Sequence, residues 1–222
     1  MGKMIELTAK DGHKLGAYVT GPEPKGNKAL VVIQEIFGVN SHMRRVCEMY
    51  GSQGYAVIAP ALFDRVERGA ELGYQPDDMA RGRELRGKVP DEGMLADVAA
   101  AKAYVDSASK VGIVGYCWGG SVAWLGNTRL GFDASSSYYG GQIVQAKDEK
   151  PNGPAMMHFG TEDKSIPMSD VEQIKAAQPK AEIHVYEGAQ HGFCCDDRGS
   201  FSEKDCKVAN ERTLAFFEKT LA

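Results

Sequence analysis

Residues 112–120 read Gly-Ile-Val-Gly-Tyr-Cys-Trp-Gly-Gly, an apolar segment that runs into the pattern Gly115-x-Cys117-x-Gly119. The stretch Ser121-Val-Ala-Trp-Leu125 follows, as expected for a helix packed on a strand. Glycines two residues before and two after the cysteine let the chain turn sharply without a Cβ clash. The pattern therefore predicts a reactive side chain at the apex of a strained turn, and we interpret Cys117 as a nucleophile.

The rest of the chain alternates between short apolar strands and amphipathic segments. We expect strands at residues 5–8, 15–20, 29–34, 55–59, 111–114, 135–139, 155–159 and 183–186, and helices at 41–53, 91–107, 121–125, 168–177 and 202–221. The first two strands flank a turn at Asp11-Gly12 and should form a hairpin, whereas residues 64–90 are polar and are expected to be irregular. This order predicts an α/β fold with a mostly parallel twisted sheet, helices on both faces, and one domain over residues 1–222.

Composition excludes several functional classes. The 222 residues carry a net charge of −4, with no basic cluster suited to nucleic acid or to an anionic membrane surface. The amino-terminal residues contain no apolar signal region, and no later run is long enough to span a membrane. We therefore expect a soluble, cytoplasmic protein that is a monomer or a weak homodimer.

The five cysteines give no even disulfide framework, which suits a reducing compartment. Cys47 lies at helical spacing with apolar neighbours and is interpreted as a small buried hydrophobe. Cys194, Cys195 and Cys206 lie near His191, but their spacing matches no common zinc pattern. We therefore expect no metal.

A thiol nucleophile needs a base, because a free cysteine is mostly protonated at neutral pH. Downstream, Asp163 follows a predicted strand and His191 follows the last one, which gives the order nucleophile, acid, histidine. Asp163 would orient the imidazole and stabilise its charged form. The adjacent Glu162 is a rival for that role. The other histidines are interpreted as solvated (His13 and His42) or as hydrogen-bonded histidines in the core or on a sheet face (His158 and His184).

Four segments together resemble dienelactone hydrolases. They are Gln-Glu-Ile-Phe-Gly-Val-Asn at 34–40, Gly-Tyr-Cys-Trp-Gly-Gly at 115–120, Gly-Thr-Glu-Asp-Lys-Ser-Ile-Pro at 160–167, and His-Gly-Phe at 191–193. The resemblance covers nearly the whole chain and implies the α/β-hydrolase fold. The first segment is the most specific, because generic serine hydrolases carry a different loop there.

The resemblance implies a role for each matching residue. Cys117, Asp163 and His191 would form a catalytic triad, and Glu35 would hydrogen-bond the resting thiol and help to generate the thiolate when substrate arrives. The backbone amides of Ile36 and Trp118 would form the oxyanion hole. Two backbone amides in such an oxyanion hole are also expected on physical grounds, since each preorganised amide lowers the activation barrier of acyl transfer by about 2–4 kcal/mol.

One departure from the family concerns the substrate carboxylate, which the prototype holds with two arginines. The position four residues after His191 is Cys195 here, and Arg198 is a possible substitute. As the second arginine that would hold the substrate carboxylate we select Arg81. The alternative interpretation is that Arg81 lies on the solvent-exposed face of a helix. Three tyrosines are further pocket candidates by location alone: Tyr74, Tyr138 and Tyr139.

These observations predict a hydrolase that cleaves a lactone or small carboxylic ester, similar to carboxymethylenebutenolidase, through a thioester and without a cofactor. One alternative is a broad carboxylesterase with promiscuous activity on phosphoesters. A second is a thiol-redox protein in which Cys117 forms a sulfenate or a disulfide with Cys194 or Cys195. A third is a ligand-binding scaffold without catalysis.

Overall fold

The computed structural model describes residues 2–222, which form two compact units, one ending at Gly112 and the other beginning at Ile113. The first unit contains strands β1 (Lys3–Thr8), β2 (Lys14–Thr20), β3 (Lys28–Ile33) and β4 (Ala56–Pro60), with helices α1 (Ser41–Ser52), η1 (Leu62–Arg65), α2 (Pro76–Lys88) and α3 (Asp91–Tyr104). Strand β5 (Lys110–Tyr116) leads into the second unit, which contains α4 (Trp118–Leu130), β6 (Ala134–Tyr138), η2 (Gly141–Ala146), β7 (Ala155–Gly160), α5 (Met168–Ala177), β8 (Glu182–Tyr186) and α6 (Glu203–Thr220).

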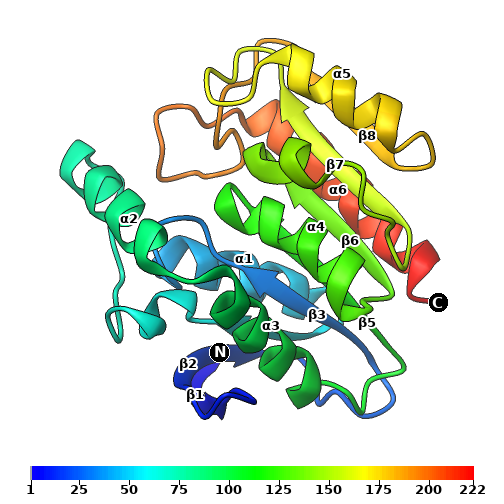
Figure 1. Ribbon diagram of the computed structural model, residues 1–222. Helices are drawn as coiled ribbons and strands as arrows, with labels where there is room; N and C mark the ends of the chain where they lie inside the picture. Colours follow the sequence, from blue (N-terminus) through cyan, green and yellow to red (C-terminus); the bar gives the residue numbers. More distant parts are fainter. Residues whose placement is uncertain (1) are drawn as a thin grey trace. The chain divides into compact units, whose positions relative to one another are not determined.

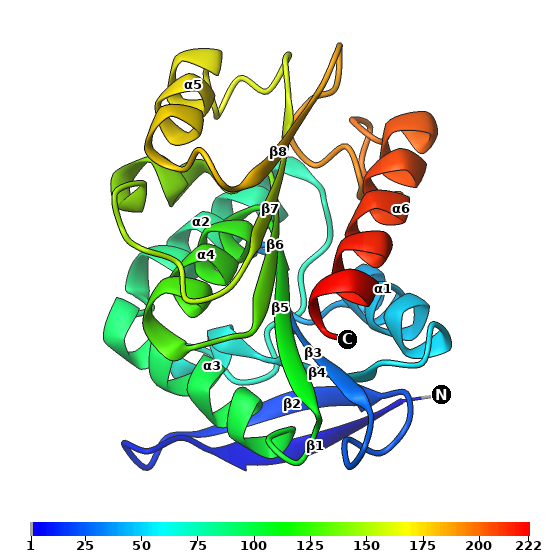
Figure 2. The same ribbon diagram turned by 90° about the vertical axis from the view of Figure 1, so that its right-hand side faces the viewer.

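The strands of the first unit follow the order β1-β2-β4-β3. The β1–β2 hairpin is antiparallel, β2 pairs antiparallel with β4, and β3 pairs in parallel with β4. Helices α1 and α3 lie on opposite faces of β3 and β4 (Figure 2), which explains why β3 is apolar along almost its whole length. The predicted hairpin is therefore confirmed.

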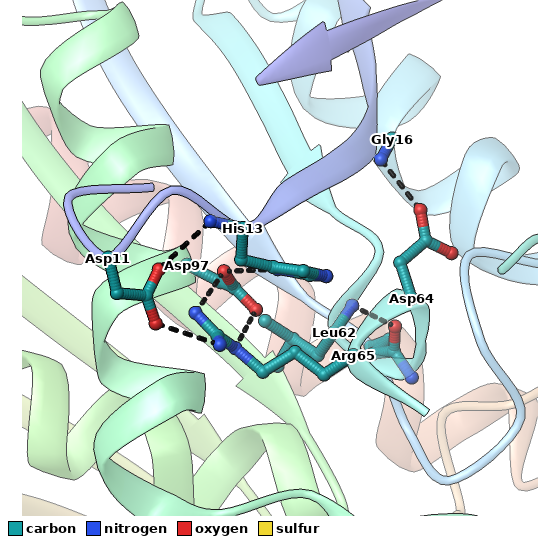
Figure 3. Close-up of polar contacts among 8 residues, drawn as sticks. Asp11, His13, Gly16, Leu62, Asp64, Arg65 and Asp97 are labelled. Atoms are coloured by element: carbon teal, nitrogen blue, oxygen red, sulfur yellow. Dashed lines mark hydrogen bonds and ion pairs between the residues drawn. The ribbon is translucent and has the colours of Figure 1, made fainter. Parts of the chain in front are cut away.

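A buried ionic network ties together three parts of the first unit (Figure 3). Arg65 of η1 donates two hydrogen bonds to Asp97 of α3, at 2.7 and 2.8 Å. Nδ1 of His13, which follows the hairpin turn, lies 3.1 Å from Oδ1 of Asp97, an oxygen that also accepts from Arg65. Burial raises the pKa of Asp97, although both partners oppose that shift. The expectation that His13 is solvated is therefore wrong, because its ring turns inward to a buried acid.

In the second unit, β6, β7 and β8 pair in parallel. Helices α4 and α5 cover one face of these strands and α6 covers the other (Figures 1 and 2). His158 of β7 is fully buried and bonded through both ring nitrogens, to Tyr186 and to Thr213 of α6, at 2.9 Å each. Burial lowers the pKa of His158 well below its usual value, so the ring is a neutral core residue, as expected.

Helix α2 contradicts the expectation that residues 64–90 are irregular. Its residues are mostly polar, and only Gly82 and Leu85 are buried, so no apolar periodicity marks it. Pro76 occupies the first turn, and Asp78 accepts the backbone N–H of Gln75 at 3.1 Å. The Gln-Pro-Asp-Asp stretch at 75–78 therefore carries the sequence signal for the start of helix α2.

Two smaller expectations are also resolved. Helix α1 is capped by Asn40, whose side chain accepts the Met43 N–H at 3.2 Å. His42 at the start of this helix is buried, against expectation, whereas Cys47 is a buried hydrophobe, as predicted.

Among residues 2–222, no helix combines the length and apolar character needed to cross a lipid bilayer.

Candidate active site

Cys117 stands at the junction of β5 and α4, where the backbone is strained. Its φ of 57° and ψ of −119° lie outside the regions that L-residues prefer. A Cβ on Gly115 would lie 1.9 Å from the carbonyl oxygen of Gly119, and a Cβ on Gly120 would lie 2.5 Å from that of Tyr138. Glycine is therefore required at 115 and 120 for the sharp turn to form. The thiol itself is half-buried and free of any disulfide.

His191 follows β8, and its ring is bonded to an acid that follows β7. The Nδ1 atom of His191 lies 2.7 Å from Oδ2 of Asp163, while Oδ1 of Asp163 accepts the Ser165 N–H at 2.8 Å. The Asp163 side chain is 1% exposed, whereas the rival Glu162 is exposed. The bond to the carboxylate keeps a proton on Nδ1 and leaves Nε2 for proton exchange.

The electrostatics of His191 couple it to Cys117. Burial alone would lower the pKa of His191, but the charge and hydrogen bond of Cys117, together with those of Asp163, raise it to about 10. Cys117 and Asp163 together therefore favour the protonated form of His191. A protonated imidazole beside a thiol places a proton donor next to a nucleophile.

The loop that carries His191 is tied to α6 by a disulfide. Cys194 pairs with Cys206, with their Cα atoms 4.7 Å apart, a pairing that the uneven number of cysteines did not predict. The reason is that the loop after β8 folds back onto the first turn of α6. Cys195 is fully buried, so neither Cys194 nor Cys195 presents the accessible thiol that the redox alternative requires.

Arg198 also lies in this loop. A Cβ on Gly192, which has a φ of +77°, would lie 2.4 Å from a guanidinium nitrogen of Arg198. The guanidinium therefore packs on the backbone next to His191. Ser200 holds the same loop, because its hydroxyl donates to the carbonyl oxygen of His191 at 2.8 Å.

The predicted oxyanion donors lie at distinct places in the chain. Trp118 is the first residue of α4, and the N–H groups of a first helical turn point outward from the helix. Ile36 follows β3 in the first unit, where a Cβ on Gly82 would lie 2.0 Å from its carbonyl oxygen. The backbone at Ile36 is therefore packed closely against α2.

Glu35 and Arg81 both belong to the first unit. The carboxylate of Glu35 is fully buried and accepts the Tyr74 hydroxyl at 3.3 Å. Arg81 lies on α2, where its guanidinium pairs with Glu67 and, at 2.7 Å, with Glu84. A carboxylate ligand would have to compete with these two acids for Arg81.

The two tyrosines at the end of β6, Tyr138 and Tyr139, gave only a weak sequence signal, and their side chains point to different neighbours. Tyr138 turns toward α6, where its hydroxyl bonds Thr213 at 2.7 Å. The Tyr139 ring instead packs beside His191, with ring centroids 5.2 Å apart. Tyr139 has a φ of 40°, which sequence patterns do not reveal in a residue other than glycine.

Comparisons with known proteins agree with this fold. A family model described as "Dienelactone hydrolase family" matches residues 15–221. A Synechocystis protein named "Putative carboxymethylenebutenolidase" is 35% identical over 94% of this chain and 93% of its own length. The "Carboxymethylenebutenolidase" of Pseudomonas putida is 33% identical over 96% of this chain and 94% of its own.

A solved structure extends the comparison to three dimensions. The crystal structure of a "Putative Dienelactone Hydrolase" from Klebsiella pneumoniae is 31% identical, covers 97% of this chain and 99% of its own, and has a TM-score of 0.84. The predicted α/β-hydrolase fold and the predicted class of ester or lactone hydrolase are thus confirmed. This chain belongs to the dienelactone hydrolase family.

Proposed function

We propose that this protein hydrolyses small carboxylic esters or lactones through a thioester on Cys117, with His191 carrying protons and Asp163 orienting His191. The observation that carries the proposal is the 2.7 Å bond between Asp163 and His191, on an imidazole whose pKa is raised by Cys117. A nucleophile, a base and an orienting acid are the parts that acyl transfer needs.

In the first half-reaction, the Cys117 sulfur attacks the carbonyl carbon and a C–S bond forms. The carbonyl electron pair moves onto oxygen, and this oxyanion would accept hydrogen bonds from the amides of Trp118 and, by the family resemblance, Ile36. The intermediate then collapses as the C–O bond to the alkoxide breaks. The alkoxide takes the proton from Nε2 of His191, and a lactone would stay attached through its acyl chain.

In the second half-reaction, the neutral His191 removes a proton from water as the oxygen of that water attacks the thioester carbon. The C–S bond breaks, the acid is released, and the proton on His191 again faces the sulfur. Asp163 keeps the ring in one tautomer during both steps and stabilises the imidazolium.

We retain the family role of Glu35 as a proposal: in the resting protein its carboxylate hydrogen-bonds the protonated Cys117 thiol, which keeps the sulfur less oxidisable, and Glu35 helps to generate the thiolate when substrate arrives. Its complete burial supports a special role, because a carboxylate is costly to remove from water. The test is the rate of Cys117 alkylation by iodoacetamide. Glu35→Gln should react faster than wild type, and equal rates would exclude shielding.

The substrate class follows the family, whose named relatives are carboxymethylenebutenolidases. Arg81 is the proposed anchor for an anionic substrate. Its ion pairs with Glu67 and Glu84 favour the broader carboxylesterase function as the second candidate. If Arg81 binds substrate, Arg81→Ala should raise KM for an anionic lactone but not for a neutral ester, whereas the exposed Arg83→Ala on the same helix should change neither.

The experiment that tests the function itself is hydrolysis of p-nitrophenyl acetate and of a lactone panel by wild type, Cys117→Ala and Cys117→Ser. Turnover by wild type and its loss in Cys117→Ala support the thioester route. Undiminished turnover in Cys117→Ala would refute it. No turnover by any form, with ligand binding intact, would favour the scaffold.

We also propose that residues 1–222 act as one family domain, in the cytoplasm, as a monomer or weak homodimer. The family model supports the first point, since its match at 15–221 runs through the boundary at Gly112. Limited proteolysis, cell fractionation and light scattering test the three points in turn.

A further inference from the structure

The residues that leave strand β6 contact both halves of the proposed catalytic pair. We call Tyr138, Tyr139 and Gly140 the β6 corner. The carbonyl oxygen of Tyr138 accepts the N–H of Cys117 at 3.0 Å, which fixes the backbone of the nucleophile. The next residue, Tyr139, packs its ring beside His191. Two consecutive residues therefore contact the thiol-bearing turn and the imidazole.

A backbone hydrogen bond and close packing hold Tyr139 in this position. Its N–H donates to the carbonyl oxygen of His158 at 2.8 Å, and its side chain is fully buried. The ring centroid lies 5.2 Å from that of His191 at an interplanar angle of 59°, and 5.4 Å from that of Phe193 at 71°. Tyr139 thus supports the imidazole on one side while Asp163 holds its Nδ1.

The backbone at the corner is strained and closely packed. Among residues 2–222, Cys117 and Tyr139 are the two residues other than glycine with a positive φ. Such a conformation is unfavourable for a tyrosine and persists only where the surroundings enforce it. A Cβ on Gly140 would lie 2.8 Å from backbone atoms of both Gly120 and Ser121, so the corner lies directly on the first turn of α4.

We infer that Tyr139 is a positioning residue, whose ring sets the orientation of His191 relative to Cys117 and so determines how well the pair exchanges a proton. This inference rests on the proposed function, because it assigns to Tyr139 a role in the same proton transfer. Tyr139 acts through His191 and needs no contact with substrate. Removing its ring should reduce kcat and leave KM nearly unchanged.

The test compares Tyr139→Leu and Tyr139→Met, which remove the ring, with Tyr139→Phe, which keeps it. Phe132→Leu is the matched control, because Phe132 is a buried aromatic residue before the opposite end of β6. We expect Tyr139→Leu to lower kcat about 10- to 100-fold, since small misplacements of reacting groups have effects of this size. Tyr139→Phe and Phe132→Leu should stay within about threefold of wild type.

A second readout does not need ester turnover. The titration of His191, followed by NMR, and the pH dependence of Cys117 alkylation should both shift in Tyr139→Leu but not in Phe132→Leu. If wild type hydrolyses no ester, the proposed function fails, while these two measurements still decide whether Tyr139 positions His191. If Tyr139→Leu does not fold, Tyr139→Met carries the same comparison.

Three results would overturn the inference. The first is a kcat within threefold of wild type in folded Tyr139→Leu or Tyr139→Met. The second is a rise in KM at constant kcat, which would make Tyr139 a substrate contact. The third is an equal loss in Tyr139→Phe, which would assign the effect to the hydroxyl instead of the ring.

Discussion

Replacing Asp163 by asparagine should slow the proposed reaction strongly without unfolding the protein. Oδ1 of Asp163 accepts the Ser165 N–H at 2.8 Å, and an asparagine oxygen can keep that bond. The amide NH₂ group must then face Nδ1 of His191, where the carboxylate oxygen now lies at 2.7 Å. Because two donors cannot share a hydrogen bond, Nδ1 loses its proton and the ring keeps its remaining proton on Nε2, so His191 can no longer accept a proton at that atom.

The magnitude follows from the bond that is lost. A hydrogen bond from an imidazolium to a carboxylate contributes about 1.5–3 kcal/mol, which is about 10- to 150-fold in rate. The wrong tautomer adds to this loss, and in serine hydrolases the same change costs about 10⁴-fold. We therefore expect kcat of Asp163→Asn to fall about 10²- to 10⁴-fold.

The assay is p-nitrophenyl acetate hydrolysis at neutral pH, together with the ¹⁵N shifts of His191, which report the tautomer. Glu162→Gln is the matched control, because Glu162 is the adjacent acid and its side chain is exposed. It should stay within about twofold of wild type. A kcat of Asp163→Asn within tenfold of wild type, or an equal loss in Glu162→Gln, would refute the role of Asp163.

The remaining predictions concern pH, the disulfide and the ionic network. Since Cys117 raises the pKa of His191, NMR should show that the ring stays protonated to about pH 10 in wild type and loses that proton at lower pH in Cys117→Ala. The charge on His191 contributes fully to the stability of the fold below the unfolded-state pKa of 6.5, and this contribution is lost as the pH rises through about 10. An unchanged titration of His191 in Cys117→Ala would contradict the coupling between the two residues. In Cys194→Ser the disulfide that spans 12 residues is lost, so the free energy of unfolding in urea should fall by about 3 kcal/mol, and a reductant should further destabilise only the wild type. Asp97→Ala removes the buried partner of Arg65 and should cost about 3–5 kcal/mol in the same assay, and a loss below 1 kcal/mol would show that the network contributes little.

The sequence predicted the elements whose residues face an apolar core. Strand β3 and the helix at Met168–Ala177 both carry apolar patterns that admit one interpretation. Helix α2 escaped detection because its polar residues show no periodicity, and its start is marked only by local capping chemistry. Hydrophobic patterns report burial, so an exposed helix leaves no such signal.

The pairing of Asp163 with His191 was predictable from topology. Both residues follow neighbouring parallel strands, whose carboxyl ends meet at one edge of a sheet. The contact of Tyr139 with His191 and the Cys194–Cys206 disulfide were not predictable, because they depend on how the chain returns after a strand ends. Loop paths are set by tertiary packing and carry no periodic pattern.

The central claim is that a covalent thioester forms on Cys117. Wild-type protein mixed rapidly with p-nitrophenyl acetate and quenched in acid should carry an acetyl group on the peptide containing Cys117, and this group should disappear at the rate of steady-state turnover. Ester turnover with no acetyl group on Cys117, or with the acetyl group on another residue, would contradict the account.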